Sequence, residues 1–158
     1  MRIYLVRHGQ TVVSRDKKEA WESYGLFGPP LSNAAIEKSH ELSAHFGVLG
    51  IDVESEVAAT SEYLRARQTA EYAGFTSVEN PLLNEVKTTD SHQSRAMLKE
   101  GKVPEEAEAA ARALLRDMPA ERIWFTHGLI IAGLLYLTGQ TKSQDLEPPF
   151  ATIITIDV

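Results

Sequence analysis

The stretch RIYLVRHG at residues 2–9 predicts the first strand of the fold and the first candidate site residues. Residues 2–6 are rich in β-branched, aromatic and aliphatic side chains, a pattern typical of a short buried strand. Arg7 and His8 follow where that strand ends, and Gly9 allows the backbone to turn sharply or to approach a ligand closely. Taken alone, the tripeptide is equally consistent with ordinary polar residues at a strand exit, because a site needs several convergent groups.

Short apolar runs and helical segments alternate along the rest of the chain. Strands are predicted at 57–60, 76–79, 122–126 and 151–157, and helices at 33–49, 62–73, 105–118 and 129–137. Ser32 is the expected N-cap of the first of these helices, with an apolar side formed by Ile36, His40, Leu42, Phe46 and Leu49. Residues 10–31 are expected to form a long loop, and residues 85–103 to be irregular or weakly helical. This order predicts an α/β fold, a three-layer sandwich whose mostly parallel central sheet has helices on both faces.

Length and composition favour one soluble domain over residues 1–158. The net charge of −6 argues against nucleic acid and anionic membrane as partners, since the only basic cluster is Arg15, Lys17 and Lys18. The absence of cysteine excludes a disulfide framework, a thiolate nucleophile and a cysteine-ligated zinc. The first residues lack the pattern of a signal peptide and no apolar run reaches 18 residues, so a cytoplasmic protein is expected.

Polar side chains follow several of the predicted strands. In parallel sheets, ligands bind outside the carboxyl ends of the strands. His8 follows the first strand, Ser61 the second, and His127 the strand at 122–126. His127 is followed by a glycine and then a helix, whose free N–H groups form an anion site. A single His at a strand end is more often structural than catalytic. Two His-Gly pairs, each directly after a buried strand, favour a functional role for both histidines.

Two arginines and a glutamate add to these histidines. Arg65 and Arg67 lie in the first turns of the helix after Ser61, and arginine is suited to bidentate contact with phosphate. Being two residues apart, they point in different directions, so at most one faces the site. Glu85 is a candidate proton donor or acceptor, although taken alone it is an ordinary loop glutamate.

Together these segments resemble the histidine phosphatase superfamily, also called the phosphoglycerate mutase-like family. LVRHGQT at residues 5–11 resembles its nucleophile motif, and GPPLS at 28–32 the segment before its first helix. SEYLRARQTA at 61–70 is similar to the family signature Ser-x-Leu-x-Arg-Ala-x-x-Thr-Ala, which assigns the family arginine to Arg65. Asn84-Glu85 resembles the acid/base segment, and Thr126-His127-Gly128 the second histidine motif.

The resemblance implies a two-step phosphoryl transfer through a phosphohistidine on His8. An ordinary imidazole titrates near pH ~6.5, so its nucleophilic form is present at neutral pH. Arg7, Arg65 and His127 would bind the phosphate oxygens with His8, and Glu85 would protonate the leaving oxygen and then deprotonate water. Because protein cations take the place of a metal, the resemblance implies no metal and no cofactor.

Three positions depart from the usual family pattern. Ser14 stands where asparagine is usual, Ala35 where glycine is usual, and Ala132 where arginine is frequent. Ser14 and Ala132 argue against a bisphosphorylated sugar as substrate, but none of the three is part of the four-residue phosphate pocket. A small phosphomonoester or a phosphoprotein, such as one carrying phosphohistidine, is therefore the expected substrate and partner.

Other interpretations stay open. A phosphoglycerate-type mutase needs a cover over its site, and residues 85–103 are the only segment for it. A non-catalytic phosphate-binding module would keep the same residues. A metal site of His8, His127 and Glu85 lacks a close ligand spacing such as His-Glu-x-x-His. The aromatics of the 10–31 loop, Trp21, Tyr24 and Phe27, either wall the pocket or anchor the loop to the core, the more common outcome for large aromatics.

Overall fold

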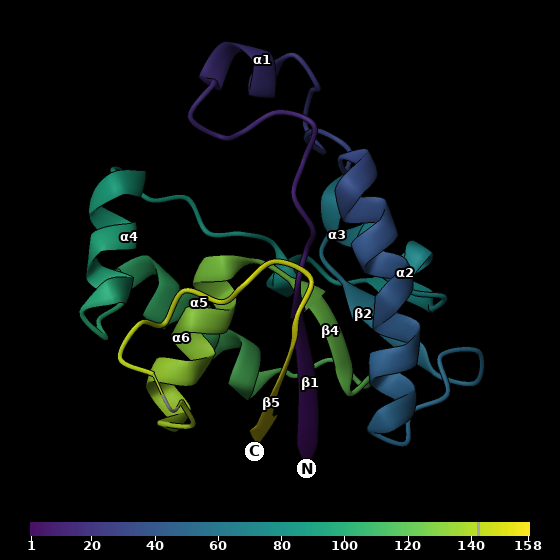
Figure 1. Cartoon of the computed structure of the whole chain (residues 1–158). Helices are drawn as coiled ribbons and strands as arrows, with labels where there is room; N and C mark the ends of the chain where they lie inside the picture. The colour runs from purple at the N-terminus through teal and green to yellow at the C-terminus, as the bar shows by residue number, and fades with distance from the viewer. Residues whose placement is uncertain (142) are drawn as a thin grey trace.

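The computed structural model describes residues 1–141 and 143–158, which fold around a five-stranded sheet (Figure 1). Its strands are β1 (Arg2–Arg7), β2 (Val57–Thr60), β3 (Thr76–Glu79), β4 (Ile123–Thr126) and β5 (Ile153–Asp157). Their order is β3-β2-β4-β1-β5, and only β5, at one edge, pairs antiparallel. The predicted mostly parallel sheet is confirmed.

Helices cover both faces of the sheet, as predicted. On one face lie α2 (Asn33–Val48) and α3 (Leu64–Tyr72), and on the other α4 (Ser91–Lys99), α5 (Glu105–Arg116) and α6 (Gly128–Thr138) (Figure 1). A 3₁₀ turn, η1 (Pro81–Leu83), follows β3. The short helix α1 (Lys18–Glu22) stands apart above the carboxyl ends of the strands (Figure 1).

Strand β1 separates two apolar cores. Its side chains alternate between faces, so that Ile3 and Leu5 pack toward α5 and α6 while Tyr4 and Val6 pack toward α2 and α3. All four are buried. Burial on both faces explains why this strand is a continuous apolar run rather than an alternating one.

The first helix begins where predicted, but its buried side is different. Ser32 caps α2, and its hydroxyl accepts a hydrogen bond from the Ala35 N–H at 3.2 Å. The predicted apolar residues His40 and Leu49 are exposed, whereas Ala35 and Ser39 are buried together with Leu42 and Phe46. The prediction was correct for Leu42 and Phe46 and wrong for His40 and Leu49, because it did not foresee that small residues would form part of the buried side. The first turn of α2 packs closely against Gly9, and only small side chains fit there: a Cβ on Gly9 would lie only 2.9 Å from the Cβ of Ala35.

Helices are present in the segment predicted to be irregular or weakly helical, 85–103, and in the segment predicted to be a long loop, 10–31. Residues 85–103 include α4, whose N-cap Asp90 accepts hydrogen bonds from the backbone N–H groups of His92 and Gln93. Its only deeply buried apolar side chain is Leu98, so the pattern of apolar residues was too weak to predict it. The 10–31 loop includes α1, which buries none of its residues and therefore left no hydrophobic pattern.

Candidate active site

Two neighbouring strands bring the two histidines together. β1 and β4 pair in parallel with Arg7 opposite Thr126, so His8 and His127 leave the sheet side by side. Their ring centroids lie 5.1 Å apart, and both side chains are buried. The predicted juxtaposition at the carboxyl ends of the strands is thus present in the structure.

The ring of His8 is held in one orientation. Its Nδ1 lies 2.7 Å from the carbonyl oxygen of Gly9, and since a carbonyl only accepts, Nδ1 carries the hydrogen. Nε2 is left with a lone pair, toward which the Nε–H of Arg65 donates at 3.3 Å. Burial, followed by the charge of Arg65, holds the pKa of His8 well below its usual value. His8 is therefore a neutral imidazole with a free electron pair on Nε2.

His127 leaves a ring nitrogen free in the same place. Its Nε2 lies 2.7 Å from the hydroxyl oxygen of Ser61, which in turn accepts from the Tyr63 N–H at 3.3 Å. The hydroxyl of Ser61 can donate its hydrogen to Nε2, and in that tautomer the ring hydrogen of His127 is on Nδ1. Nδ1 is buried and has no partner among the described residues. Burial above all, then His8, lowers the pKa of His127 well below its usual value.

The last residue of β1, Arg7, lies beneath a segment from the other end of the chain. Its Nη1 donates to the carbonyl oxygen of Pro148 at 2.8 Å and lies 3.6 Å from the carboxylate of Glu147. The ring of Phe150 stacks on the guanidinium, with its centroid 3.9 Å from Cζ. A Cβ on Gly128 would come within 3.3 Å of the Arg7 Nε, so glycine lets α6 begin against this side chain.

Arg65 enters the pocket from the first turn of α3. Only 2% of it is exposed, and its pKa is lowered to about 10, chiefly by burial and then by the charge of Arg15. Gly28, which has a φ of +79°, lies against the guanidinium: a Cβ there would be 3.0 Å from Nη1. Arg67 points elsewhere and pairs with Glu79 at 3.5 Å. The expectation that only one of the two arginines faces the site is met by Arg65.

Glu85 follows η1 in the chain, and its side chain contacts the first turn of α6. Its Oε2 accepts from the backbone N–H of Leu129 at 3.3 Å. Burial raises its pKa above the usual value for glutamate, although the hydrogen bond from Leu129 and the charge of Arg15 act in the opposite direction. A raised pKa is the property expected of a carboxyl group that gives and takes a proton near neutral pH.

A family model supplies the identification. The model for the histidine phosphatase superfamily (branch 1) matches residues 3–120, which contain β1, α3 and Glu85. The chain belongs to the histidine phosphatase superfamily.

Solved structures share this histidine phosphatase fold over nearly the whole chain. The crystal structure of TTHB049 from Thermus thermophilus is 25% identical, with a TM-score of 0.67 over 99% of this chain and 94% of that one. A phosphoglycerate mutase from the same organism is 24% identical, with a TM-score of 0.65 over 99% and 93%. Rv3214 from Mycobacterium tuberculosis is 19% identical, with a TM-score of 0.58 over 98% and 89%. No curated protein sequence matches the chain.

Residues that sequence reasoning missed surround the superfamily motifs. Glu147, Pro148 and Phe150 contact Arg7 across more than a hundred residues of sequence, and they lie outside the stretch that the family model matches. The only local signal was the rigid EPPF segment before the last strand. Arg15 was noticed only as part of a basic cluster, and its charge acts on both histidines and on Glu85.

Two features are absent from residues 1–141 and 143–158, the part of the chain that the structure describes. No three His, Cys, Asp or Glu side chains there are grouped closely enough to hold a metal ion between them. None of the helices in the same residues has the length and apolar character needed to cross a bilayer.

Proposed function

We propose that this protein is a metal-independent phosphatase that transfers a phosphoryl group first to His8 and then to water. The observation that carries the proposal is the state of the His8 ring. The hydrogen bond from Nδ1 to Gly9 leaves the Nε2 lone pair facing the Arg65 guanidinium in a buried pocket. The positive charge of Arg65 attracts the phosphate group, and the phosphorus atom is then close to the nucleophilic Nε2 of His8.

The pocket offers donors for the phosphoryl oxygens. Arg7 Nε and His127 Nδ1 are buried and lack partners among the described residues, while Arg65 has only the lone pair of His8 opposite its Nε. Unpaired buried donors cost free energy, and a bound dianion would satisfy them. In phosphoryl transfer, such preorganised donors stabilise the charge spread over the equatorial oxygens of a loose transition state.

Glu85 supplies the proton transfers. In the first step a bond forms between His8 Nε2 and phosphorus, the bond to the leaving oxygen breaks, and Glu85 gives its proton to that oxygen. In the second step Glu85, now a carboxylate, takes a proton from water, and the water oxygen displaces His8. The raised pKa of Glu85 supports the protonated form that the first step requires.

The substrate proposed is a phosphomonoester, either a small molecule or a phosphoprotein. One structural neighbour is a phosphoglycerate mutase. The alternative for this chain is a mutase reaction, in which a substrate hydroxyl instead of water accepts the phosphoryl group in the second step. Release of free phosphate, measured beside isomerisation of a phosphoglycerate, separates the two reactions.

The test is to trap the intermediate. Rapid quenching during turnover of an aryl phosphate should yield an acid-labile phosphate on His8, located by mass spectrometry of the modified peptide. Turnover should also persist in EDTA, since protein cations surround the phosphate. His92→Ala, which changes an exposed histidine on α4, is the control and should label as the wild type does. Absence of label during phosphate release, or activity lost in EDTA and restored by a divalent metal, would contradict the proposal.

A further inference from the structure

Residues 143–152, which precede β5 and are drawn in yellow in Figure 1, cross to the carboxyl end of β1. We call residues 146–151 the strap. At one end of the strap the Leu146 N–H donates to the carbonyl oxygen of Leu98 in α4 at 2.9 Å. At the other end the Ala151 N–H donates to the carbonyl oxygen of Arg7 at 2.9 Å. The strap is therefore fixed between α4 and the strand that carries Arg7.

Three residues of the strap contact the guanidinium of Arg7. Its Nη1 donates to the carbonyl oxygen of Pro148 at 2.8 Å and lies 3.6 Å from the carboxylate of Glu147. The ring of Phe150 stacks on the flat face of the guanidinium. Nε, which shares an edge of the guanidinium with Nη2, is buried and has no partner among the described residues. The strap thus contacts one end and one face of Arg7 and leaves the Nε–Nη2 edge for a phosphate.

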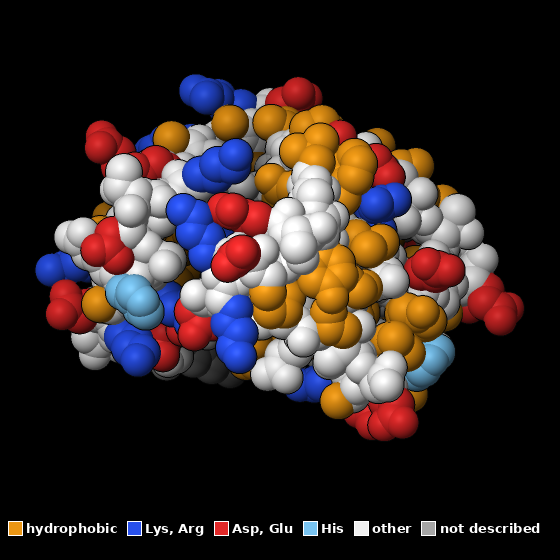
Figure 2. Space-filling view, turned by 90° about the horizontal axis from the view of Figure 1, so that it is seen from above, with side chains coloured by type: hydrophobic (Ala, Val, Ile, Leu, Met, Phe, Trp, Pro, Cys, Tyr) orange, Lys and Arg blue, Asp and Glu red, His pale blue; other side chains and the backbone are white. Residues whose placement is uncertain are grey.

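The carboxylate of Glu147 is shared by two arginines. The same oxygen lies 3.6 Å from Arg7 Nη1 and 3.7 Å from the Nε of Arg95 on α4. Arg95 is 59% exposed, whereas Arg7 is only 10% exposed. Figure 2 looks down on this end of the molecule and shows Asp or Glu side chains beside Lys or Arg ones. A charge pair is screened by water on the side of Arg95 and much less on the side of Arg7.

The two arginines of the pocket are held differently. Among residues 1–141 and 143–158, Arg65 has no carboxylate oxygen within 4.0 Å, and Arg7 has that of Glu147. Burial lowers the pKa of Arg7, and the charge of Glu147 is the main effect in the opposite direction. Glu147 therefore stabilises a buried cation that would otherwise have only the Pro148 carbonyl at its Nη1.

We propose that Glu147 is a positioning residue for Arg7: with Phe150 on the other side, it holds the guanidinium so that the Nε–Nη2 edge meets the transferred phosphoryl group. A guanidinium binds phosphate most strongly through two parallel N–H groups, which requires a fixed plane. The role rests on the proposed phosphatase function. It adds to the site two residues that lie outside the stretch matched by the family model.

The backbone of the strap is itself constrained. Ala151 is buried and has a φ of +46°, in the left-handed region that alanine rarely adopts. Such a conformation persists where the surrounding contacts impose it. The hydrogen bonds at the two ends of the strap are contacts of this kind. The path that brings Glu147 and Phe150 to Arg7 is therefore imposed by the fold.

The alternative is that Glu147 only ties the strap to α4 through Arg95. The test compares kcat/KM for para-nitrophenyl phosphate in the wild type, Glu147→Ala and Arg95→Ala. If Glu147 acts on Arg7, removal of Arg95 leaves that contact in place. If Glu147 is only a tie to α4, the two variants lose the same contact and behave alike.

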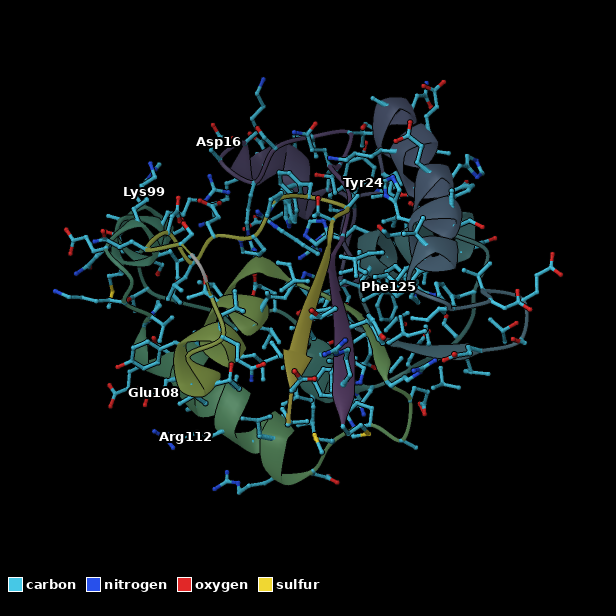
Figure 3. All side chains as sticks on the ribbon, turned by 60° about the horizontal axis from the view of Figure 1, so that its bottom comes forward. Asp16, Tyr24, Lys99, Glu108, Arg112 and Phe125 are labelled. Atoms are coloured by element: carbon cyan, nitrogen blue, oxygen red, sulfur yellow. The ribbon has the colours of Figure 1, made fainter. Side chains whose placement is uncertain are left out.

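The matched control is Glu108→Ala, which also removes a glutamate from an ion pair. Glu108 lies 2.8 Å from Arg112 on α5. Both residues are labelled in Figure 3, where they lie apart from Asp16 and Tyr24, the residues that flank α1. The control therefore reports the effect of losing a surface ion pair away from the pocket.

Glu147→Ala should lower kcat/KM about tenfold, mainly through kcat, because Arg65 and His127 still bind the phosphate while Arg7 is misaligned. Arg95→Ala and Glu108→Ala should stay within about twofold of the wild type, since each removes an exposed pair. Equal losses in Glu147→Ala and Arg95→Ala, an unchanged Glu147→Ala, or a loss confined to KM would overturn the positioning role.

A second background tests whether Glu147 acts through Arg7. Arg7→Lys keeps a charge but has no planar edge to orient. Adding Glu147→Ala to Arg7→Lys should therefore change kcat/KM by less than about twofold, because the group through which Glu147 acts is gone. A further tenfold loss in this background would mean that Glu147 acts by another route.

A spectroscopic measurement separates this role from the proposed function. If the wild type releases no phosphate, the phosphatase proposal fails, and the positioning role is then decided by the NMR signal of the Arg7 Nε–H, assigned by its loss in Arg7→Lys. The heteronuclear NOE of this signal should fall in Glu147→Ala, as the side chain becomes more mobile, and should stay unchanged in Arg95→Ala. An unchanged NOE in Glu147→Ala would overturn the positioning role.

Discussion

The floor of the candidate active site and the loop above it are held in different ways. His8 and His127 follow paired strands, and their side chains are 8% and 0% exposed. The 10–31 loop is joined at its base, where Val12 N–H donates to Pro30 and Ser32 N–H donates to Gln10. At its tip, α1 buries no residue.

This contrast indicates that the floor of the site and the loop above it have different roles. The floor is positioned by the sheet, so its groups keep the distances that phosphoryl transfer requires. The loop contributes exposed groups whose exchange leaves the sheet intact. Substitutions in the floor should therefore remove the chemistry, and substitutions in the loop should change which substrates are used.

The largest expected effect comes from the floor. His8→Ala should lower the turnover of an aryl phosphate by at least ~10³-fold, because removal of a nucleophile removes the covalent route. Steady-state kinetics measure the loss, and circular dichroism checks that the fold survives. Near-native turnover by a folded variant would show that the floor does not supply the nucleophile.

A comparison within α3 sharpens the contrast. Arg65→Ala should lower kcat/KM by roughly 10²-fold or more, since a phosphate-binding arginine stabilises the transition state by several kcal/mol. Arg67→Ala removes a side chain that pairs with Glu79 outside the pocket and should leave kcat/KM within about threefold of the wild type. Equal losses in the two variants would mean that the pocket is built differently.

The pH dependence of kcat/KM tests the electrostatics of the floor. Because the pKa of His8 is lowered, His8 stays unprotonated below pH ~6.5, the ordinary imidazole value, and activity should persist there. Arg65 contributes to that lowering, so the acid limb of the profile should move to higher pH in Arg65→Ala. An acid limb at the ordinary imidazole value in the wild type would contradict the buried, neutral histidine.

The smallest expected effect concerns stability. His127 is buried with a lowered pKa, so below pH ~6.5 the unfolded chain binds a proton that the folded chain does not, and stability falls as the pH falls. The loss from this group is about 1 kcal/mol for each pH unit below that value, until the pH reaches the folded-state pKa. Urea unfolding at pH ~6.5 and one unit lower should show a weaker pH dependence in His127→Asn than in the wild type.

The exposed His92 provides the control for that experiment. His92→Asn should keep the pH dependence of the wild type, because this side chain lies in solvent on α4. If His127→Asn and His92→Asn behave alike, the buried imidazole is not what links stability to pH.

Much of this fold was predictable from local patterns. The apolar run before His8, the Ser32 cap and the glycine after His127 each act over a few residues, so each can be recognised without knowing the rest of the chain. Their order along the chain predicted the parallel sheet, and the sheet predicted that His8 and His127 would meet. Glu85 was predicted only through the family resemblance, because a loop glutamate has no local pattern of its own.

Other features depended on the folded chain. The extent of α4 and the full buried side of α2 are decided by what packs against them, so the sequence pattern predicted them only in part. The supports of Arg7 at Glu147 and Phe150 lie about as far from it in sequence as the chain allows.

The fold class was thus predictable from the order of the elements, and the two His-Gly junctions from local patterns at strand ends, whereas Arg65 was assigned to the pocket through the family signature. Which ring nitrogen of His8 is free and which carboxylate contacts Arg7 depended on the tertiary structure. Those properties depend on burial and on contacts between segments far apart in the chain. No local pattern encodes them, since burial and long-range contact exist only once the chain has closed on itself.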